Sequence, residues 1–189
     1  MTTGDHMKIQ MLDLEGAAVV DTTPFVDERG TFARIFCEHE LSDLMGGRRI
    51  VNVNISKTLK CGVIRGMHFQ RPPKAEIKMM RCVRGSIYDV IIDIRRVSPT
   101  FLQWYGTELS SENMKMLFVP EGFAHGFQSL EDDSDVMYFN TNFYSPTHES
   151  GLNYADPKIG IKWKLNVTSV SDKDKNHPFI NDQFNGFVL

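Results

Sequence analysis

The chain has 189 residues and a formal net charge of −3, with 21 basic and 24 acidic residues. Both signs of charge are mixed along the sequence, which argues against a nucleic-acid-binding surface. No apolar run approaches the roughly 20 residues of a membrane span, and the N-terminal MTTGDHMKIQM lacks the pattern of a secretory signal. We expect one domain over residues 1–189, with a sizeable core.

Three cysteines occur, an odd number with irregular spacing (Cys37, Cys61 and Cys82). Such a pattern favours reduced thiols over a disulfide framework or a zinc site. Reduced thiols and the lack of a secretory signal together predict a cytoplasmic protein.

Short runs rich in β-branched and aromatic residues recur between turn signals such as Pro72-Pro73 and Arg84-Gly85. We predict strands over residues 31–37, 50–56, 62–68, 76–83, 86–94, 116–119 and 135–141. Strands of this length and spacing are typical of a sandwich, jelly roll or barrel.

One helix is predicted over residues 38–45, because Leu41, Leu44 and Met45 have the spacing of a single helical face. Gly46 and Gly47 follow as a C-terminal cap. The stretch from about residue 156 is polar and rich in Asn, Asp and Pro, and we expect it to cover the barrel as loops and short helical turns.

The segment GVIRGMHFQ, residues 62–70, carries Arg65 and His68 on one expected strand. Three residues separate them, so a regular strand would point them to opposite faces. A bulge at Gly66 would bring both to one face, because glycine tolerates the required dihedral angles. The alternative is a half-buried histidine beside a solvated arginine.

The segment PEGFAHGF, residues 120–127, resembles the second short motif of cupin barrels, and residues 62–70 resemble the first. Metal-binding cupins have a second histidine where this chain has Gln70, and a glutamate that is absent here at the usual spacing. His68 and His125 alone do not supply the three or four protein ligands of a catalytic metal. We therefore expect no catalytic metal. The sequence also lacks a G-x-G-x-x-G phosphate loop, and we expect no organic cofactor.

Three further polar residues are ambiguous when each is considered alone. Lys78 and Glu76 alternate with Ile77 and Met79, so one face of the strand is polar and the other apolar. A lysine facing a barrel lumen would be electrostatically strong, although exposed lysines are commoner. A tyrosine such as Tyr138 is more often a packing residue than an acid, and Asp174 ordinarily indicates a solvated turn.

The combined motifs resemble the dTDP-4-dehydrorhamnose 3,5-epimerase family. The matching segments follow the family's order and are PFVDERGTF (24–32), GVIRGMHFQ (62–70), KMMRCVRGSIYDVIIDIR (78–95), SPTFLQW (98–104), LFVPEGFAHGF (117–127), VMYFNTNFYSPTHESGL (136–152), ADPKIGIKW (155–163) and SDKD (171–174). The resemblance implies an all-β cupin jelly-roll barrel with short peripheral helices, usually a homodimer. It also implies an isomerase in activated deoxysugar biosynthesis that acts on a nucleotide-diphospho-4-keto-6-deoxy sugar.

By this resemblance His68 is the general base and Asp174 its partner, while Tyr138 is the acid on the other side of the sugar. Lys78 would hold the carbonyl oxygen that becomes an enolate, with His125 close by. The substrate-binding residues that the resemblance implies are Arg29, Arg34, Asn52, Asn54, Arg65, His125, Phe143, Glu149 and Lys173. Of these, Arg29, Arg65 and Lys173 would contact the diphosphate or sugar, and Phe143 would stack on the base.

The chain departs from the family mainly at nucleotide-contact positions. Arg34 stands where a glutamate is usual, which reverses the charge beside the expected nucleotide, and Arg34→Glu is expected to weaken substrate binding. Phe143 replaces a frequent tyrosine, Asn52 stands where a glutamine is common, and Glu76 replaces a usual glutamine near Lys78. We infer that the chemistry is retained while the nucleotide or sugar can differ from thymidine and rhamnose.

Four other functions remain as alternatives. A single-site epimerase or a 3,4-ketoisomerase would use a related nucleotide sugar, and Tyr138 favours epimerisation because inversion needs a second proton donor. A non-catalytic sugar-binding cupin has no need of a paired acid and base. A metal-dependent cupin oxygenase lacks its ligands.

Overall fold

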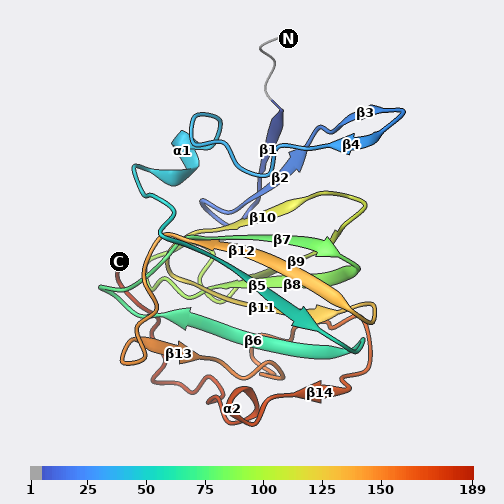
Figure 1. Cartoon of the computed structure of the whole chain (residues 1–189). Coiled ribbons are helices and arrows are strands. Elements are labelled where there is room, and N and C mark those ends of the chain that lie inside the picture. The colour runs from blue at the N-terminus through green and yellow to red at the C-terminus, as the bar shows by residue number, and fades with distance from the viewer. Residues whose placement is uncertain (1–5) are drawn as a thin grey trace.

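The computed structural model describes residues 6–189 and is built mainly from two sheets of largely antiparallel strands (Figure 1). The first sheet contains, in spatial order, β1 (Met7–Met11), β2 (Ala18–Thr22), β10 (Met116–Val119), β7 (Lys78–Arg84), β12 (Ser134–Asn140) and β5 (Asn52–Thr58). The second contains β13 (Glu149–Gly151), β6 (Val63–Gln70), β11 (Phe123–Ser129), β8 (Ser86–Asp93) and β9 (Trp104–Ser110). β14 (Ser169–Val170) adds to β6 in parallel.

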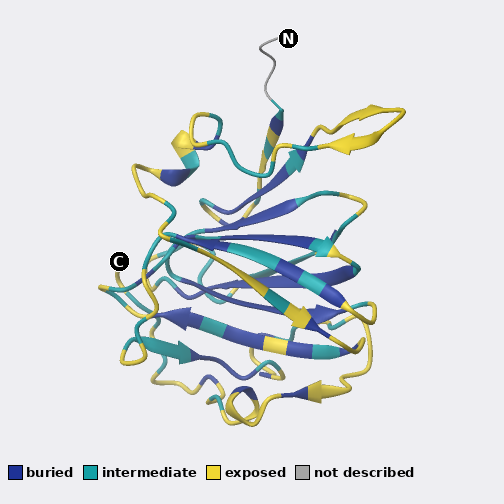
Figure 2. Ribbon diagram, viewed as in Figure 1, coloured by how far each residue is buried: buried dark blue, intermediate teal, exposed yellow. Residues whose placement is uncertain are grey.

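Three smaller elements lie outside the sheets. A hairpin of β3 (Phe25–Asp27) and β4 (Gly30–Phe32) projects from the body of the molecule, and Figure 2 shows it fully exposed. α1 (Ser42–Met45) lies beside the first sheet, and α2 (Asp172–Lys175) follows β14 near the second. No helix within residues 6–189 is long and apolar enough to cross a bilayer.

The central core lies between the two sheets and takes side chains from both. Val19, Met80 and Leu117 come from the first sheet, and Ile87 and Phe127 come from the second. All eight residues of β8 are buried because this strand is covered on both faces. Its alternate residues join the central core and a second cluster beneath the C-terminal segment.

The predicted all-β jelly roll of the cupin type is confirmed, and most predicted strands coincide with observed ones. The prediction of one strand over residues 31–37 is wrong beyond Phe32, because Ile35 and Phe36 pack irregularly against the outer face of the first sheet. The helix predicted over residues 38–45 is shortened to Ser42–Met45, and Gly46 ends it in the left-handed conformation as expected.

The polar C-terminal stretch covers the second sheet through a few apolar anchors. Ile159 and Ile180 are buried beside Ile92 and Ala124 in the outer cluster of that sheet. The stretch contributes β14 and α2, whose positions beside β6 matter for the site described next.

Candidate active site

A cavity of about 500 Å³ is lined by strands of both sheets and by the C-terminal segment. The first sheet contributes Lys78 and Tyr138, from neighbouring strands. The second contributes Arg65, His68 and His125, from β6 and β11. The C-terminal segment contributes further lining residues, among them Ser171, Lys173 and Asp174.

A β-bulge in β6 brings Arg65 and His68 to this one cavity. His68 lies opposite His125, and Arg65 lies opposite Phe127, so β6 has one residue more than β11 between these pairs. Gly66 has a φ of +126°, and a Cβ on it would lie 2.5 Å from Gly126 Cα. The predicted bulge at Gly66 is confirmed, since only glycine fits both the dihedral angle and the space.

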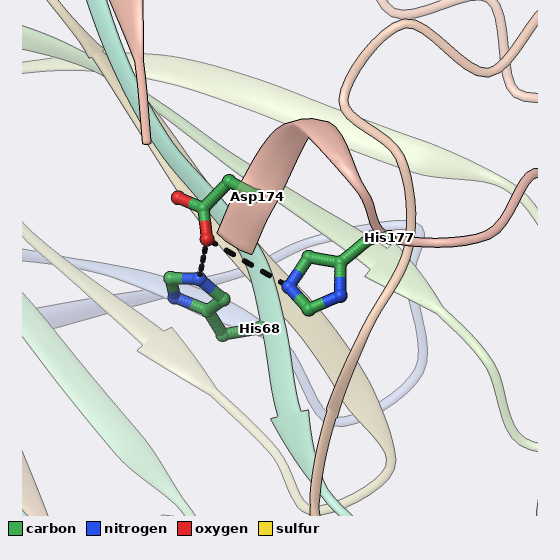
Figure 3. Close-up of side chains that lie close together, drawn as sticks. All are labelled: His68, Asp174 and His177. Carbon is green, nitrogen blue, oxygen red and sulfur yellow. Dashed lines mark hydrogen bonds and ion pairs between the residues drawn. The ribbon is translucent and has the colours of Figure 1, made fainter. Parts of the chain in front are cut away.

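His68 and Asp174 form a close pair (Figure 3). Nε2 of His68 lies 2.7 Å from Oδ1 of Asp174, and the other carboxylate oxygen accepts the Gly66 backbone N–H at 3.0 Å. Asp174 lies in α2, whose first turn is capped by Ser171, because the Ser171 hydroxyl accepts the Asp174 N–H at 3.1 Å. The cap and the bulge therefore fix both partners.

The Asp174 carboxylate is ionised despite being 4% exposed. Burial would raise its pKa, but the hydrogen bonds from His68 and from the Gly66 N–H outweigh burial and hold the pKa below its usual value. An ionised carboxylate accepts a hydrogen bond from the Nε2–H of a neutral imidazole. Nδ1 of His68 then carries the lone pair that can act as a base.

Lys78 reaches the cavity from β7, and its ammonium lies 3.4 Å from a carboxylate oxygen of Glu76. Ile77 and Met79 point away into the cluster beneath α1, as the alternation predicts. Burial raises the pKa of Glu76, although the charges of Lys78 and His125 oppose this. The Lys78 side chain is only 17% exposed, so water solvates its ammonium poorly and the field of the ammonium is strong.

Tyr138 lies on β12 directly across from Met80 and lines the same cavity. Burial raises the pKa of its phenol, and the nearby Arg65 only partly offsets this. A raised pKa keeps the phenol protonated at neutral pH, as a proton donor requires.

A second histidine–carboxylate pair lies beside the first. His125 Nε2 is 2.6 Å from Oδ1 of Asp89, and Asp89 is completely buried on β8. In the sequence, Asp89 is a lone polar residue within the apolar run YDVII. Its partner became identifiable only from the register of β8 and β11, in which His125 lies next to Ile91.

Two cations border the cavity on other sides. Arg65 donates to the Thr58 hydroxyl at 3.1 Å and to the Lys57 carbonyl at 2.9 Å. Lys173 forms an ion pair with Glu149 at 2.6 Å, so Glu149 contacts the site through Lys173 rather than by lining it.

Arg29 and Arg34, two predicted substrate-binding residues, do not line the cavity. Arg29 lies on the exposed β3–β4 hairpin and pairs with Asp27 at 2.5 Å. Arg34 pairs with Glu40, which also accepts the backbone N–H groups of His6 and Met7 at the start of β1. Their roles in binding remain predictions.

Asn52, Asn54 and Phe143 also lie outside the lining. Asn54 donates to the Asn52 side chain at 2.9 Å, and Asn52 donates to the Asn142 carbonyl at 3.1 Å. Phe143 is 64% exposed, so most of its side chain is open to solvent. Stacking of Phe143 on a nucleotide base remains a prediction.

The family model described as dTDP-4-dehydrorhamnose 3,5-epimerase matches residues 11–182. The dTDP-4-dehydrorhamnose 3,5-epimerase of Shigella flexneri is 40% identical over 171 residues, which cover 90% of this chain and 94% of the relative.

Two solved structures are similar over nearly their whole length. The epimerase of the same name from Bacillus anthracis, with TDP and PPi bound, has a TM-score of 0.89 at 39% identity, covering 92% of this chain and 99% of that one. The Legionella pneumophila dTDP-6-deoxy-D-glucose-3,5-epimerase, in complex with dTDP-4-keto-L-rhamnose, has a TM-score of 0.89 at 34% identity, covering 97% and 100%. The chain therefore belongs to the dTDP-4-dehydrorhamnose 3,5-epimerase family.

Proposed function

We propose that this chain converts dTDP-4-keto-6-deoxyglucose to dTDP-4-keto-L-rhamnose by inverting carbons 3 and 5, as a step of dTDP-rhamnose biosynthesis. The observation that carries the proposal is the His68–Asp174 pair at 2.7 Å, in a cavity that also contains Lys78 and Tyr138. Membership of the family supports the same substrate class, because two similar structures contain TDP or a dTDP-4-keto sugar.

The reaction begins with removal of a hydrogen from a carbon beside the ketone. Nδ1 of His68 takes this proton, and Asp174 stabilises the resulting imidazolium and keeps the ring oriented. The electron pair of the C–H bond moves onto the ketone oxygen and forms an enolate. Lys78 stabilises this oxygen more strongly as negative charge develops, which lowers the barrier rather than merely tightening binding.

Inversion requires a proton from the opposite face. His68 lies on the second sheet, whereas Lys78 and Tyr138 lie on the first, so a sugar in the cavity has the base and the acid on different sides. Tyr138 donates its phenolic proton to the carbanionic carbon, and the enolate collapses to the ketone. Exchange with water then restores both groups, and the cycle repeats at the second carbon.

The diphosphate requires positive charge, and Arg65 and Lys173 supply it at the edge of the cavity. His125, paired with buried Asp89, lies beside Lys78 in our assignment and assists at the ketone oxygen. Neither assignment requires a redox step or a bound cofactor.

We infer that two copies form a homodimer. The exposed apolar residues Phe25, Val26 and Phe32 lie on the projecting hairpin, and Val53 and Ile55 lie on the edge strand β5. Exposed apolar residues on a projecting hairpin and on an unpaired edge strand are typical of an interface. Sedimentation equilibrium tests this inference, and a monomer at micromolar concentration would contradict it. The cytoplasmic setting and the single domain over residues 1–189 stay predictions.

Proton NMR in deuterium oxide tests the main proposal with dTDP-4-keto-6-deoxyglucose as substrate. We expect deuterium at carbons 3 and 5 and the appearance of the rhamno product. Deuterium at one carbon alone would indicate a single-site epimerase. Movement of the ketone from carbon 4 to carbon 3 would indicate a 3,4-ketoisomerase. Binding without any exchange would indicate a sugar-binding cupin.

A further inference from the structure

The imidazole of His177 is a third group at the His68–Asp174 pair (Figure 3). Its Nε2 lies 3.7 Å from Oδ1 of Asp174, the same oxygen that His68 contacts. The two imidazole rings lie edge to face with centroids 5.8 Å apart. One ring nitrogen from each histidine and one carboxylate oxygen all lie within 4.8 Å of one another.

The surrounding backbone holds His177 in this position. Gly151 of β13 lies opposite His68, and a Cβ on Gly151 would collide with Nε2 of the His177 ring. The absence of a side chain at residue 151 therefore makes the space that the ring occupies. Asn153 holds the chain on both sides of residue 176, because its amide donates to the Lys175 carbonyl at 3.0 Å and to the His177 carbonyl at 3.2 Å.

Nε2 of His177 is buried and has no hydrogen-bond partner among residues 6–189. The His177 side chain is 12% exposed, so water solvates the ring poorly. An imidazole with an unpaired nitrogen, beside a carboxylate oxygen and a second imidazole, is a metal-ligand arrangement.

We propose that His68, Asp174 and His177 form a binding site for a divalent transition-metal ion such as Zn²⁺, and that the ion blocks proton abstraction. Two imidazoles and one carboxylate are a common donor set for Zn²⁺, with a fourth position left for water. This set differs from the cupin metal ligands considered above, since it uses the C-terminal segment instead of His125.

The blocking effect follows from the tautomers of imidazole. A neutral imidazole that binds a metal ion through Nε2 carries its single hydrogen on Nδ1. The hydrogen that Nε2 donates to Asp174 in the metal-free protein must therefore move to Nδ1, and the lone pair that would abstract the substrate proton is lost. This blocking effect rests on the proposed function, whereas metal binding itself does not.

Metal binding is tested on the full chain after treatment with a chelator. We expect one Zn²⁺ per chain by calorimetry and a visible absorption band on titration with Co²⁺. His177→Asn removes a ligand, and His177→Phe keeps a ring against Gly151 without a ligand nitrogen. Both should weaken binding by at least the roughly 10- to 100-fold that loss of an outer-shell partner costs. His148→Asn is the matched control and should bind as the original chain does.

Circular dichroism first establishes that each variant is folded. Wild-type affinity in either folded His177 variant would overturn the proposed ligand set. Failure of the unaltered chain to bind Zn²⁺ or Co²⁺ at all would overturn the site.

Inhibition is tested by deuterium exchange into the 4-keto sugar. We expect Zn²⁺ to stop exchange in the unaltered chain and a chelator to restore it, whereas the exchange measured for metal-free His177→Asn should persist when Zn²⁺ is added. Continued exchange with the site saturated would overturn the blocking effect. A chain that never exchanges deuterium would contradict the proposed function, and the metal titration would still decide whether the site exists.

Discussion

Nε2 of His68 and Oδ1 of Asp174 lie 2.7 Å apart although 106 positions separate the two residues in the sequence. His68 lies within β6, whereas Asp174 lies in the single helical turn α2. Because Nε2 is held by Asp174, Nδ1 is the nitrogen left to abstract the substrate proton.

Asp174→Asn is expected to lower kcat by roughly 100- to 10,000-fold with little change in KM, as loss of the orienting carboxylate does in other base–orienter pairs. The amide does not stabilise the imidazolium and permits the unproductive tautomer. Steady-state assays measure the effect, and Asp172→Asn, an exposed residue of the same helix, is the control. A loss confined to KM would point to substrate binding instead.

Lys78→Met is expected to lower kcat by roughly 100- to 1,000-fold, because one donor to a developing oxyanion contributes about that much. Deuterium exchange and product formation should fall together, since both pass through the enolate. Lys115→Met, just before β10 and outside the cavity lining, should leave both rates unchanged. Exchange that survives in Lys78→Met would assign the oxyanion to another group, with His125 the next candidate.

Tyr138→Phe should separate exchange from inversion. His68 can still remove the proton and return a deuteron to the same face, so exchange continues while inversion falls, by the roughly 100- to 10,000-fold typical of a lost general acid. NMR in deuterium oxide reads both from one sample. Tyr144→Phe, whose exposed hydroxyl donates to Glu149, should behave as the unaltered chain does. Equal loss of exchange and inversion would reject Tyr138 as the acid of the opposite face.

Gly66→Ala should destabilise the protein by about 2–4 kcal/mol and lower its Tm by several degrees. The new methyl group would lie 2.5 Å from Gly126 Cα, and φ at residue 66 is +126°. Gly30→Ala is a closely matched control, because φ there is +127° but no atom lies within 4 Å of the added methyl. Thermal unfolding of the two variants separates backbone strain from steric collision, and equal losses would show that the glycine contact is unimportant.

Glu40 should make folding stability depend on pH. Hydrogen bonds from Arg34 and from the Met7 and His6 N–H groups outweigh burial and lower the pKa of Glu40 from 4.5 to about 2. A lowered pKa adds stability that is complete above pH 4.5 and is lost as the pH falls towards 2.

The Tm difference between the unaltered chain and Glu40→Gln should therefore be largest near pH 6 and shrink by pH 3. Glu38→Gln, in an exposed neighbour, provides the baseline. A difference that stays constant from pH 6 to pH 3 would contradict the assignment.

The strands that were predictable are those with strong local signals. Residues 86–94 and 135–141 are apolar or alternating runs between turns, and they match β8 and β12 within one residue at each end. β9 carries a glycine amid mixed residues and was missed. The stretch 33–37 is apolar because it packs on the outer face of a sheet, and local sequence does not distinguish this from a strand.

The site was predictable where the information lay within one strand. The bulge follows from the dihedral freedom of glycine at residue 66. The orientation of Lys78 follows from the alternation of side chains along a strand. The partnership of Asp89 with His125, and the approach of His177 to Asp174, depend on long-range register and on the path of the C-terminal segment. No local pattern in the sequence distinguishes these residues from ordinary buried polar groups.

β14 joins β6 through only two residues, Ser169 and Val170, and this short parallel pairing holds the helical turn that carries Asp174. The base is part of the sheet early in the chain, whereas its carboxylate docks from a segment made some hundred residues later. A protease that cuts the exposed stretch before residue 169 would thus leave a folded barrel whose histidine has lost its orientation. Catalytic activity therefore depends on the C-terminal segment being docked against β6.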